Sequence, residues 1–237
     1  MWQTERFERK FPLPEGTASQ ALALLCAYAA PDPHHPRNIV NSVYFDTIEL
    51  ESYLDAVNGD YRKGKIRARW YGESPYDDTV DLFIERKSKT GFKSSKVRTP
   101  RSVSGRTLWD DVIGQTMRHL QIESAVRSLG ESSASWFRPI IHIRYVRHRF
   151  SDPSTGTPIS LDLSIHSRLL DGSICLSPGW LVLRNAVIEI KGNMAMFPPS
   201  LHAVRRYMKV WTSFSKYTRC LDSHLERPGS IGARSAL

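Results

Sequence analysis

Basic and apolar residues alternate in the segment from Lys65 to Tyr71. Lysine or arginine stands at positions 65, 67 and 69, whereas isoleucine, alanine and tryptophan stand at 66, 68 and 70. Because successive side chains of a β-strand point to opposite faces, the segment predicts a strand with one basic face and one apolar face. A single strand of this kind is also typical of a solvated sheet edge, where charged side chains prevent aggregation.

The same alternation recurs along the chain, which favours a role for the basic face beyond solubility. Charged residues alternate with strong β-formers at residues 6–11, 80–89, 95–98 and 188–191. A closed β-barrel accommodates this pattern, since its strands can turn the apolar face outward onto helices and the charged face into a lumen. We therefore expect an α+β fold built on a closed antiparallel β-barrel with flanking helices.

Further elements are expected around these strands. Residues 18–30 are rich in helix formers and end before a proline, so they predict a helix. Residues 39–46 predict another strand, and residues 52–59 a turn region. Between them, Asp46 is expected to cap the turn that begins at Thr47.

The length and composition are those of an ordinary globular protein. The chain has 237 residues, of which 41% are hydrophobic, and no repeat or low-complexity block divides it. We therefore expect one domain over residues 1–226. Residues 227–237 offer little to bury and are predicted to form a disordered tail.

The chain is strongly basic, which limits the class of partner. Lysine and arginine together number 33 against 24 acidic residues, giving a formal net charge of +9. Polyanions are therefore the expected partners. Composition alone leaves nucleic acid, anionic membranes and phosphorylated small molecules open.

Cysteine usage and the N-terminus indicate the compartment. The three cysteines, at positions 26, 175 and 220, are odd in number and lack the paired spacing of a zinc site, which argues against a disulfide framework. The N-terminus carries charges where a signal peptide needs an apolar core, and the longest apolar run, residues 21–30, is too short to span a bilayer. We expect a cytoplasmic protein.

The charged segments, in their order and spacing, resemble the VTC (vacuolar transporter chaperone) domain, a branch of the triphosphate tunnel metalloenzymes. The matching pieces are E-R-F-E-R-K-F at 5–11, S-V-Y-F-D-T at 42–47, K-I-R-A-R-W-Y-G at 65–72, F-I-E-R-K-S-K and K-V-R between 83 and 98, Y-V-R at 145–147, L-D at 161–162, V-I-E-I-K at 187–191 and S-K-Y at 215–217. Together they extend over nearly the whole chain. The chain departs from the family pattern at Pro158, where a basic residue is frequent, and at Arg86, where an aliphatic residue is expected.

The resemblance implies a tunnel of about eight antiparallel strands lined with basic residues. Better-known VTC domains polymerise inorganic polyphosphate from ATP with a divalent metal ion, usually Mn²⁺. The expected cofactor is therefore Mn²⁺ or Mg²⁺, and the expected substrates are ATP and inorganic polyphosphate. A membrane protein that accepts the polymer is an expected partner, whereas nucleic acid is not.

The resemblance and the alternation together select candidate site residues. Those expected to take part in phosphoryl transfer are Lys10, Arg67, Arg69, Lys87, Lys191 and Lys216. Those expected to bind phosphate are Lys65, Lys96, Arg98, Arg147 and Ser215. The planar guanidinium of arginine fits phosphate oxygens, whereas lysine supplies a point charge.

Glutamates among so many cations also call for an explanation. Metal coordination would provide one, with Glu189 and either Glu8 or Glu85 holding an ion that bridges phosphate oxygens. The alternative for each glutamate is an internal salt bridge to a neighbouring cation. For Glu189 the family match favours the metal.

The expected function is that of a polyphosphate polymerase, which transfers the terminal phosphoryl group of ATP to a growing polyphosphate chain. No Ser-His-Asp or Cys-His set indicates covalent catalysis, and none is needed because the terminal phosphate of the acceptor is already an ionised nucleophile. The alternatives are a tunnel triphosphatase that hydrolyses inorganic or organic triphosphates, and a non-catalytic polyphosphate-binding sensor. An RNA-binding module is disfavoured because the sequence has no RNP-like aromatic pair.

Overall fold

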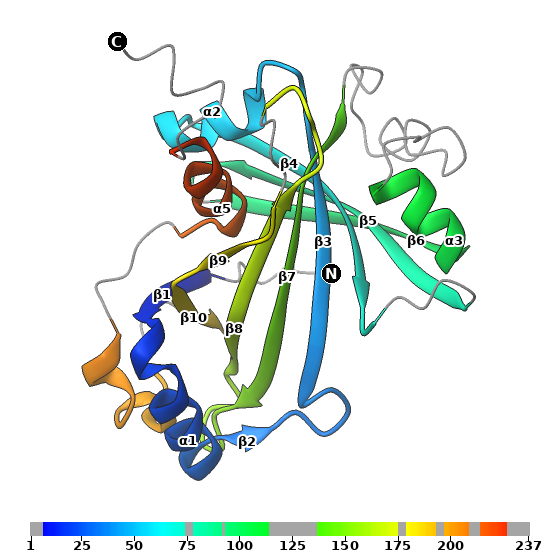
Figure 1. Cartoon of the computed structure of the whole chain (residues 1–237). Coiled ribbons are helices and arrows are strands. Elements are labelled where there is room, and N and C mark those ends of the chain that lie inside the picture. The colour runs from blue at the N-terminus through cyan, green and yellow to red at the C-terminus, as the bar shows by residue number, and fades with distance from the viewer. Residues whose placement is uncertain are drawn as a thin grey trace. The chain divides into compact units, whose positions relative to one another are not determined.

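The computed structural model describes residues 7–73, 78–91, 93–113, 137–174, 179–192, 197–208 and 214–226. Its strands are β1 (Phe7–Pro14), β2 (Ala30–Pro31), β3 (Arg37–Asp46), β4 (Arg62–Tyr71), β5 (Thr79–Thr90), β6 (Lys93–Ser104), β7 (Arg138–Ser151), β8 (Pro158–Leu169), β9 (Leu181–Leu183) and β10 (Asn185–Gly192). Its α-helices are α1 (Ala18–Tyr28), α2 (Glu51–Asn58), α3 (Gly105–Thr107) and α5 (Lys216–Leu225) (Figure 1). Short 3-10 or π-helical turns are η1 (Glu15–Thr17), η2 (Leu108–Ile113), η4 (Pro199–Leu201) and η5 (Arg205–Tyr207).

The sheet has the strand order β1-β10-β8-β7-β3-β4-β5-β6, with β2 paired to β7 and β9 paired to β8. The pairs β1–β10, β10–β8, β3–β4, β4–β5 and β5–β6 are antiparallel. The predicted antiparallel, β-rich fold with helices is thus confirmed. A closed barrel would require hydrogen bonds between the two end strands. In the described part of the chain the order begins at β1 and ends at β6, so the predicted closure is not confirmed.

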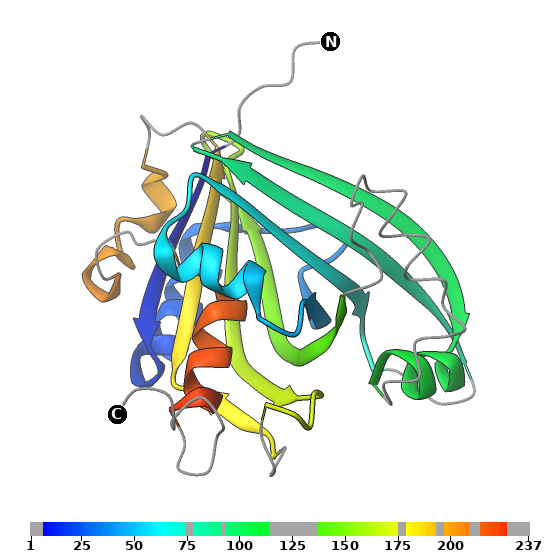
Figure 2. The same ribbon diagram turned by 90° about the horizontal axis from the view of Figure 1, so that it is seen from above.

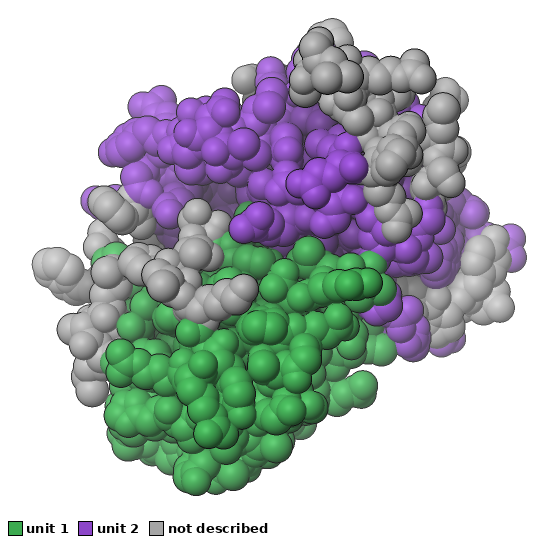
Figure 3. Space-filling view, turned by 60° about the vertical axis from the view of Figure 1, so that its left-hand side comes forward, with its two compact units in different colours: residues 1–39, 145–165, 182–215 green, residues 40–144, 166–181, 216–237 purple. Residues whose placement is uncertain are grey.

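Two compact units divide the chain and are coloured separately in Figure 3. The first unit comprises residues 1–39, 145–165 and 182–215, and the second comprises residues 40–144, 166–181 and 216–237. Because β3, β7 and β8 each continue from one unit into the other, the units are not separate stretches of sequence. The single domain over residues 1–226 stays a prediction, and the expected tail at 227–237 lies outside the described residues.

The second unit has its core on the apolar face of β4 and β5. Ile66, Ala68 and Trp70 are at most 2% exposed and pack with Phe45 and Ile84 in one apolar cluster. Residues 65, 67 and 69 alternate with these three in the strand and therefore point to the opposite face. The alternation that predicted a two-faced strand is therefore confirmed for β4.

The first unit repeats this arrangement with another core. Ile188 and Ile190 of β10 are fully buried and pack with Leu13 of β1 and Leu25 of α1. Glu189, between the two isoleucines, belongs to the opposite face of β10. Helix α1 covers this core, as its run of helix formers predicted.

Helix α2 (Glu51–Asn58) occupies most of the region 52–59 that was predicted to be a turn, and Asp46 explains the difference. Its carboxylate accepts the backbone N–H groups of Thr47 (2.9 Å), Ser52 (2.9 Å) and Tyr53 (3.0 Å), so it caps both the predicted turn and the first turn of α2. It also accepts the Tyr217 hydroxyl of α5 at 2.6 Å. Helices α2 and α5 lie side by side (Figures 1 and 2).

Among the helices that the structure describes, none combines the length and the apolar character needed to cross a bilayer.

We predict that Asp46→Ala lowers the free energy of unfolding by several kcal/mol. The carboxylate is fully buried, and its loss leaves the N–H groups of Ser52 and Tyr53 and the Tyr217 hydroxyl without their acceptor, at about 1–3 kcal/mol for each unsatisfied group. Asp32→Ala is the matched control, because Asp32 also accepts two backbone N–H groups but in an exposed loop. Denaturant unfolding of both variants measures the two losses of stability. Equal midpoints for Asp46→Ala and Asp32→Ala would contradict the predicted role of Asp46.

Candidate functional site

Three lysines form a row across the basic face of the second unit. Lys65 of β4 pairs with Lys87 of β5, which pairs in turn with Lys96 of β6. Neighbouring strands lie about 4.8 Å apart, so the row carries three positive charges at close, regular spacing. Like charges directly opposite each other on a sheet are destabilising. The row is therefore a place where an anion would be stabilising.

A second row, two residues along the strands, is organised by Glu85 of β5. Its neighbours are Arg67 on β4 and Arg98 on β6. The carboxylate is 1% exposed and accepts Arg67 Nε at 2.7 Å and Arg98 Nε at 2.7 Å. Lys96 Nζ lies 2.6 Å from Glu85, and Arg69 Nη1 lies 4.0 Å away. One buried carboxylate thus holds several predicted phosphate-binding side chains in fixed positions.

Glu85 remains ionised in this setting. Burial by itself raises the pKa of its carboxyl, but Arg67, Arg69 and Lys96 outweigh burial and hold the pKa below its usual range. The two rows together contain five cations, Lys65, Lys87, Lys96, Arg67 and Arg98, against one carboxylate. Lys96 and Arg98 keep side-chain exposures of 44% and 38%. The face is therefore positively charged and partly open to a ligand.

Tyr44 of β3 links the second row to helix α5. Arg67 Nη1 donates to the Tyr44 hydroxyl at 3.0 Å. The Tyr44 ring stacks on Tyr217 with centroids 5.0 Å apart, and the Tyr217 hydroxyl donates to Asp46. The Lys65 ammonium lies 5.6 Å from the centroid of the Tyr217 ring. The position of Arg67 is therefore coupled to the packing of α5.

The last predicted site residues of the chain lie at the start of α5. Lys216 is the first residue of this helix, directly before Tyr217, and Ser215 precedes it. Both side chains are half-buried. Their expected roles in transfer and phosphate binding stay predictions.

In the first unit, a second cluster surrounds Arg147 of β7. Its guanidinium donates to both oxygens of Asp162 at 2.6 and 2.7 Å and to Glu189 at 3.3 Å. Lys191 Nζ lies 3.1 Å from Glu189. Burial by itself lowers the pKa of Arg147, but Asp162, Tyr145 and Glu189 raise it well above its usual value. Arg147 is therefore a permanent charge held in place by two carboxylates.

Glu8 and Glu189 form the carboxylate pair that fits the metal prediction best. Strands β1 and β10 are paired so that Lys10 lies opposite Glu189, and the Glu8 side chain is a neighbour of the Glu189 carboxylate. Burial by itself raises the pKa of Glu189, whereas Arg147, Lys10 and Lys191 hold it well below its usual range. Lys10 Nζ lies 3.1 Å from Glu8. Mg²⁺ is commonly bound through one or two carboxylates plus substrate phosphates, and this pair would supply the protein's part of such a donor set.

Glu85 fits the metal prediction less well, because Arg67, Arg98 and Lys96 contact its two oxygens at 2.6 to 2.7 Å, whereas the cations paired with Glu189 lie 3.1 and 3.3 Å from it. This is the salt-bridge alternative. No group of three or more His, Cys, Asp or Glu side chains within the described ranges has the arrangement of a metal site. Metal binding by Glu189, Glu8 and Glu85 therefore stays a prediction.

Several residues of the two clusters were missed in the sequence. Tyr44 and Tyr71 accept hydrogen bonds from Arg67 and Arg98, the latter at 3.1 Å, and Asp162 anchors Arg147. The alternation contained the signal for all three, because each tyrosine is in phase with the basic face of its strand pair and Asp162 is flanked by Leu161 and Leu163.

We predict that Tyr44 ionises with a pKa of about 8. Burial by itself raises the pKa of this phenol, but Arg67, Arg69 and Lys65 together lower it from the usual value of 10.0. A lowered pKa means that ionised Tyr44 stabilises the fold fully above pH 10 and that this contribution is lost as the pH falls through 8. The measurement is phenolate absorbance against pH for wild type and Tyr44→Phe. The difference in absorbance between the two proteins should titrate near pH 8. A difference that titrates at pH 10 or above would show that the three cations do not lower the pKa of Tyr44.

Comparison with known proteins gives a family match and a set of distant structural matches, two of which are described here. The family model of the VTC domain matches residues 5–225. A candidate adenylate cyclase from Bacillus halodurans has 13% sequence identity and a TM-score of 0.46, over 99% of this chain and 100% of that one. A candidate adenylate cyclase from Vibrio parahaemolyticus has 11% identity and a TM-score of 0.48, over 92% of this chain and 99% of that one. Among the curated proteins, none matches the chain.

The family match spans nearly all of the sequence and includes every strand that carries the two clusters, from β1 to β10. The sequence resemblance to the VTC domain is therefore confirmed, and the chain belongs to the VTC domain family.

Proposed function

We propose that this chain is a polyphosphate polymerase that transfers the terminal phosphoryl group of ATP to a growing inorganic polyphosphate chain. The observation that carries the proposal is the pair of cationic rows on β4, β5 and β6, which contain five cations and one carboxylate. Polyphosphate is charged on every phosphoryl unit, so a regular array of fixed cations complements it along its length. Membership of the VTC domain family supports the same substrate class.

The array is organised before substrate arrives. Glu85 and Tyr44 fix the guanidinium of Arg67, and Glu85 with Tyr71 fixes that of Arg98. Donors held in place need little reorganisation as charge develops, which is the main source of electrostatic catalysis. Arg98 is further held by Phe83, whose ring centroid lies 4.0 Å from the guanidinium carbon. These contacts support a role in aligning phosphates.

The reaction requires alignment and charge neutralisation more than a special nucleophile. A terminal oxygen of the acceptor chain forms the new bond to the γ-phosphorus of ATP, and the bond to the β–γ bridging oxygen breaks, so that ADP leaves. The lysines and arginines neutralise the charge that the two anions bring together. A divalent ion, Mn²⁺ or Mg²⁺, supplies further neutralisation when bound, and Glu8 and Glu189 are the residues proposed to hold it.

The location of the enzyme and the destination of its product are further parts of the proposal. We infer a cytoplasmic enzyme that delivers its polymer to a membrane protein, as the resemblance implies. The basic character of the chain, with a net charge of +9, is consistent with a polyanionic product.

We expect the purified protein, incubated with ATP and Mn²⁺, to produce ADP together with a ladder of polyphosphate on a resolving gel. Release of inorganic phosphate without a ladder would instead identify a triphosphatase. Saturable binding of polyphosphate without turnover under Mn²⁺ or Mg²⁺ would identify a sensor. Either of these two results would contradict the proposed transfer.

A matched pair of variants on β6 ties the activity to the cationic face. Arg98→Ala should weaken ATP and polyphosphate binding together, by about tenfold or more, because a hydrogen bond to a charged group is worth about 1.5–3 kcal/mol. Arg101 is the control, since it is an exposed arginine in the same strand on the other face. Arg101→Ala should leave both affinities near those of the wild type. Equal losses for the two variants would indicate non-specific attraction by net charge.

A further inference from the structure

On the apolar side of β4, four aromatic residues surround a cavity of about 200 Å³. They are Trp70, Trp109, His142 and Trp180, and all belong to the second unit. Trp70 follows Arg69 directly in β4, so its side chain points to the face opposite the cationic rows. The cavity is therefore distinct from the proposed phosphate-binding face.

The hydrogen bonds of Asn41 determine which ring nitrogen of His142 carries the proton. Asn41 Nδ2 donates to the Gly72 carbonyl at 2.9 Å, so Asn41 Oδ1 is the atom 3.1 Å from His142 Nε2. An amide oxygen only accepts, and Nε2 must therefore donate. Burial, with Arg168 and Arg144, lowers the pKa of His142 to about 3. The ring is neutral near pH 7, and its Nδ1 is a hydrogen-bond acceptor.

This acceptor and the indole N–H of Trp70 are both buried, and neither has a hydrogen-bond partner among the residues that the structure describes. His142 is 3% exposed and Trp70 is 1% exposed, and their ring centroids lie 5.3 Å apart. Buried polar atoms are normally paired, because leaving them unpaired is costly. One acceptor and one donor on adjacent rings point to a ligand that presents a donor and an acceptor along one edge.

The two other aromatic residues that line the cavity favour a ligand with a flat ring. Trp109 and Trp180 are 38% and 45% exposed, so part of each indole is accessible to a ligand. The Trp180 ring meets His142 edge to face at 5.2 Å. Partly exposed tryptophans are typical platforms for stacked bases. A cavity of about 150 Å³ holds benzene, so the volume here admits a planar heteroaromatic ring.

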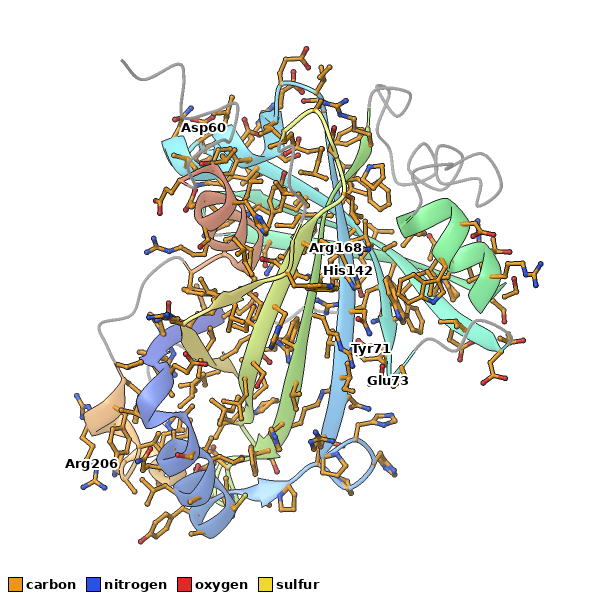
Figure 4. The ribbon with its side chains drawn as sticks, viewed as in Figure 1. Asp60, Tyr71, Glu73, His142, Arg168 and Arg206 are labelled. Atoms are coloured by element: carbon orange, nitrogen blue, oxygen red, sulfur yellow. The ribbon has the colours of Figure 1, made fainter. Side chains whose placement is uncertain are left out.

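The charges at the cavity disfavour a cationic ligand. Arg144 lines it and is paired with Glu73. Arg168, labelled beside His142 in Figure 4, has its guanidinium 5.4 Å from the Trp180 ring centroid. Two arginines against one glutamate leave the surroundings positive, which suits a neutral or anionic molecule.

We propose that this cavity binds the base of a nucleoside or nucleotide through Trp70 and His142, with Trp180 as a stacking surface. The donor and acceptor on a nucleobase edge complement the His142 acceptor and the Trp70 donor, and the positive surroundings tolerate attached phosphates. The proposal is independent of the polymerase activity, because it concerns the opposite face of β4.

Nucleosides are the appropriate probes, because they lack the phosphates that the cationic rows would bind. Adenosine, guanosine, cytidine and uridine are titrated into the whole protein by calorimetry and by tryptophan fluorescence quenching. At least one should bind saturably to the wild type. Trp180→Ala should weaken that nucleoside about tenfold or more. His142→Gln, which retains a donor toward Asn41 and removes the Nδ1 acceptor, should weaken it as well.

Two control variants test whether the nucleoside binds at this cavity. Tyr28→Ala removes an aromatic side chain that is 57% exposed in the first unit and should leave nucleoside binding unchanged. Arg98→Ala should also leave it unchanged, so a failure of the polymerase proposal remains distinguishable. The inference is overturned if no nucleoside binds saturably, if Trp180→Ala binds as the wild type does, or if ribose alone binds equally well.

Discussion

Positive charges on neighbouring strands repel one another, and β4, β5 and β6 concentrate them in adjacent rows. The buried Glu85 carboxylate makes this arrangement possible, because it accepts hydrogen bonds from Arg67 and Arg98 and forms an ion pair with Lys96. Removing one partner of a buried ion pair typically costs about 3–5 kcal/mol, much more than a surface pair contributes. The geometry of the cationic face therefore depends on this one acidic residue.

The same strands also build the core of the second unit, which explains why the charged face is rigid. Ile66, Ala68 and Trp70 are buried on one side of β4, so the backbone that carries Arg67 and Arg69 is fixed by packing. Asp46 adds a second constraint, since it joins the start of α2 to Tyr217 of α5. A site that binds a flexible polyanion gains from such support, because the protein side loses little entropy on binding.

Alternation at Lys65–Tyr71 and Val187–Lys191 was enough to predict which face of each strand is charged, because side-chain direction in a strand follows directly from sequence parity. It was not enough to predict closure, which depends on strand pairings remote in sequence. Helix α2 was missed because its start depends on a side chain at Asp46, five residues before Glu51. The His142 Nδ1 acceptor, which has no partner among the described residues, could not be foreseen either, because it results from contacts between β3 and β7 rather than from a local pattern.

The clusters around Glu85 and Arg147 are built in the same way. In each, a guanidinium is fixed by a glutamate whose pKa is held below its usual range by surrounding cations. Such side chains keep their charge over a wide pH range and offer fixed donors to phosphate oxygens. This common construction supports one class of ligand for the basic faces of both units.

The most direct measurement of the central claim is a crystal structure with tripolyphosphate bound. The account predicts phosphate oxygens within hydrogen-bond distance of the side chains of Lys87, Lys96 and Arg98, with Glu85 still paired to Arg67. Tripolyphosphate bound away from these residues, with the cationic face of β4, β5 and β6 empty, would contradict it.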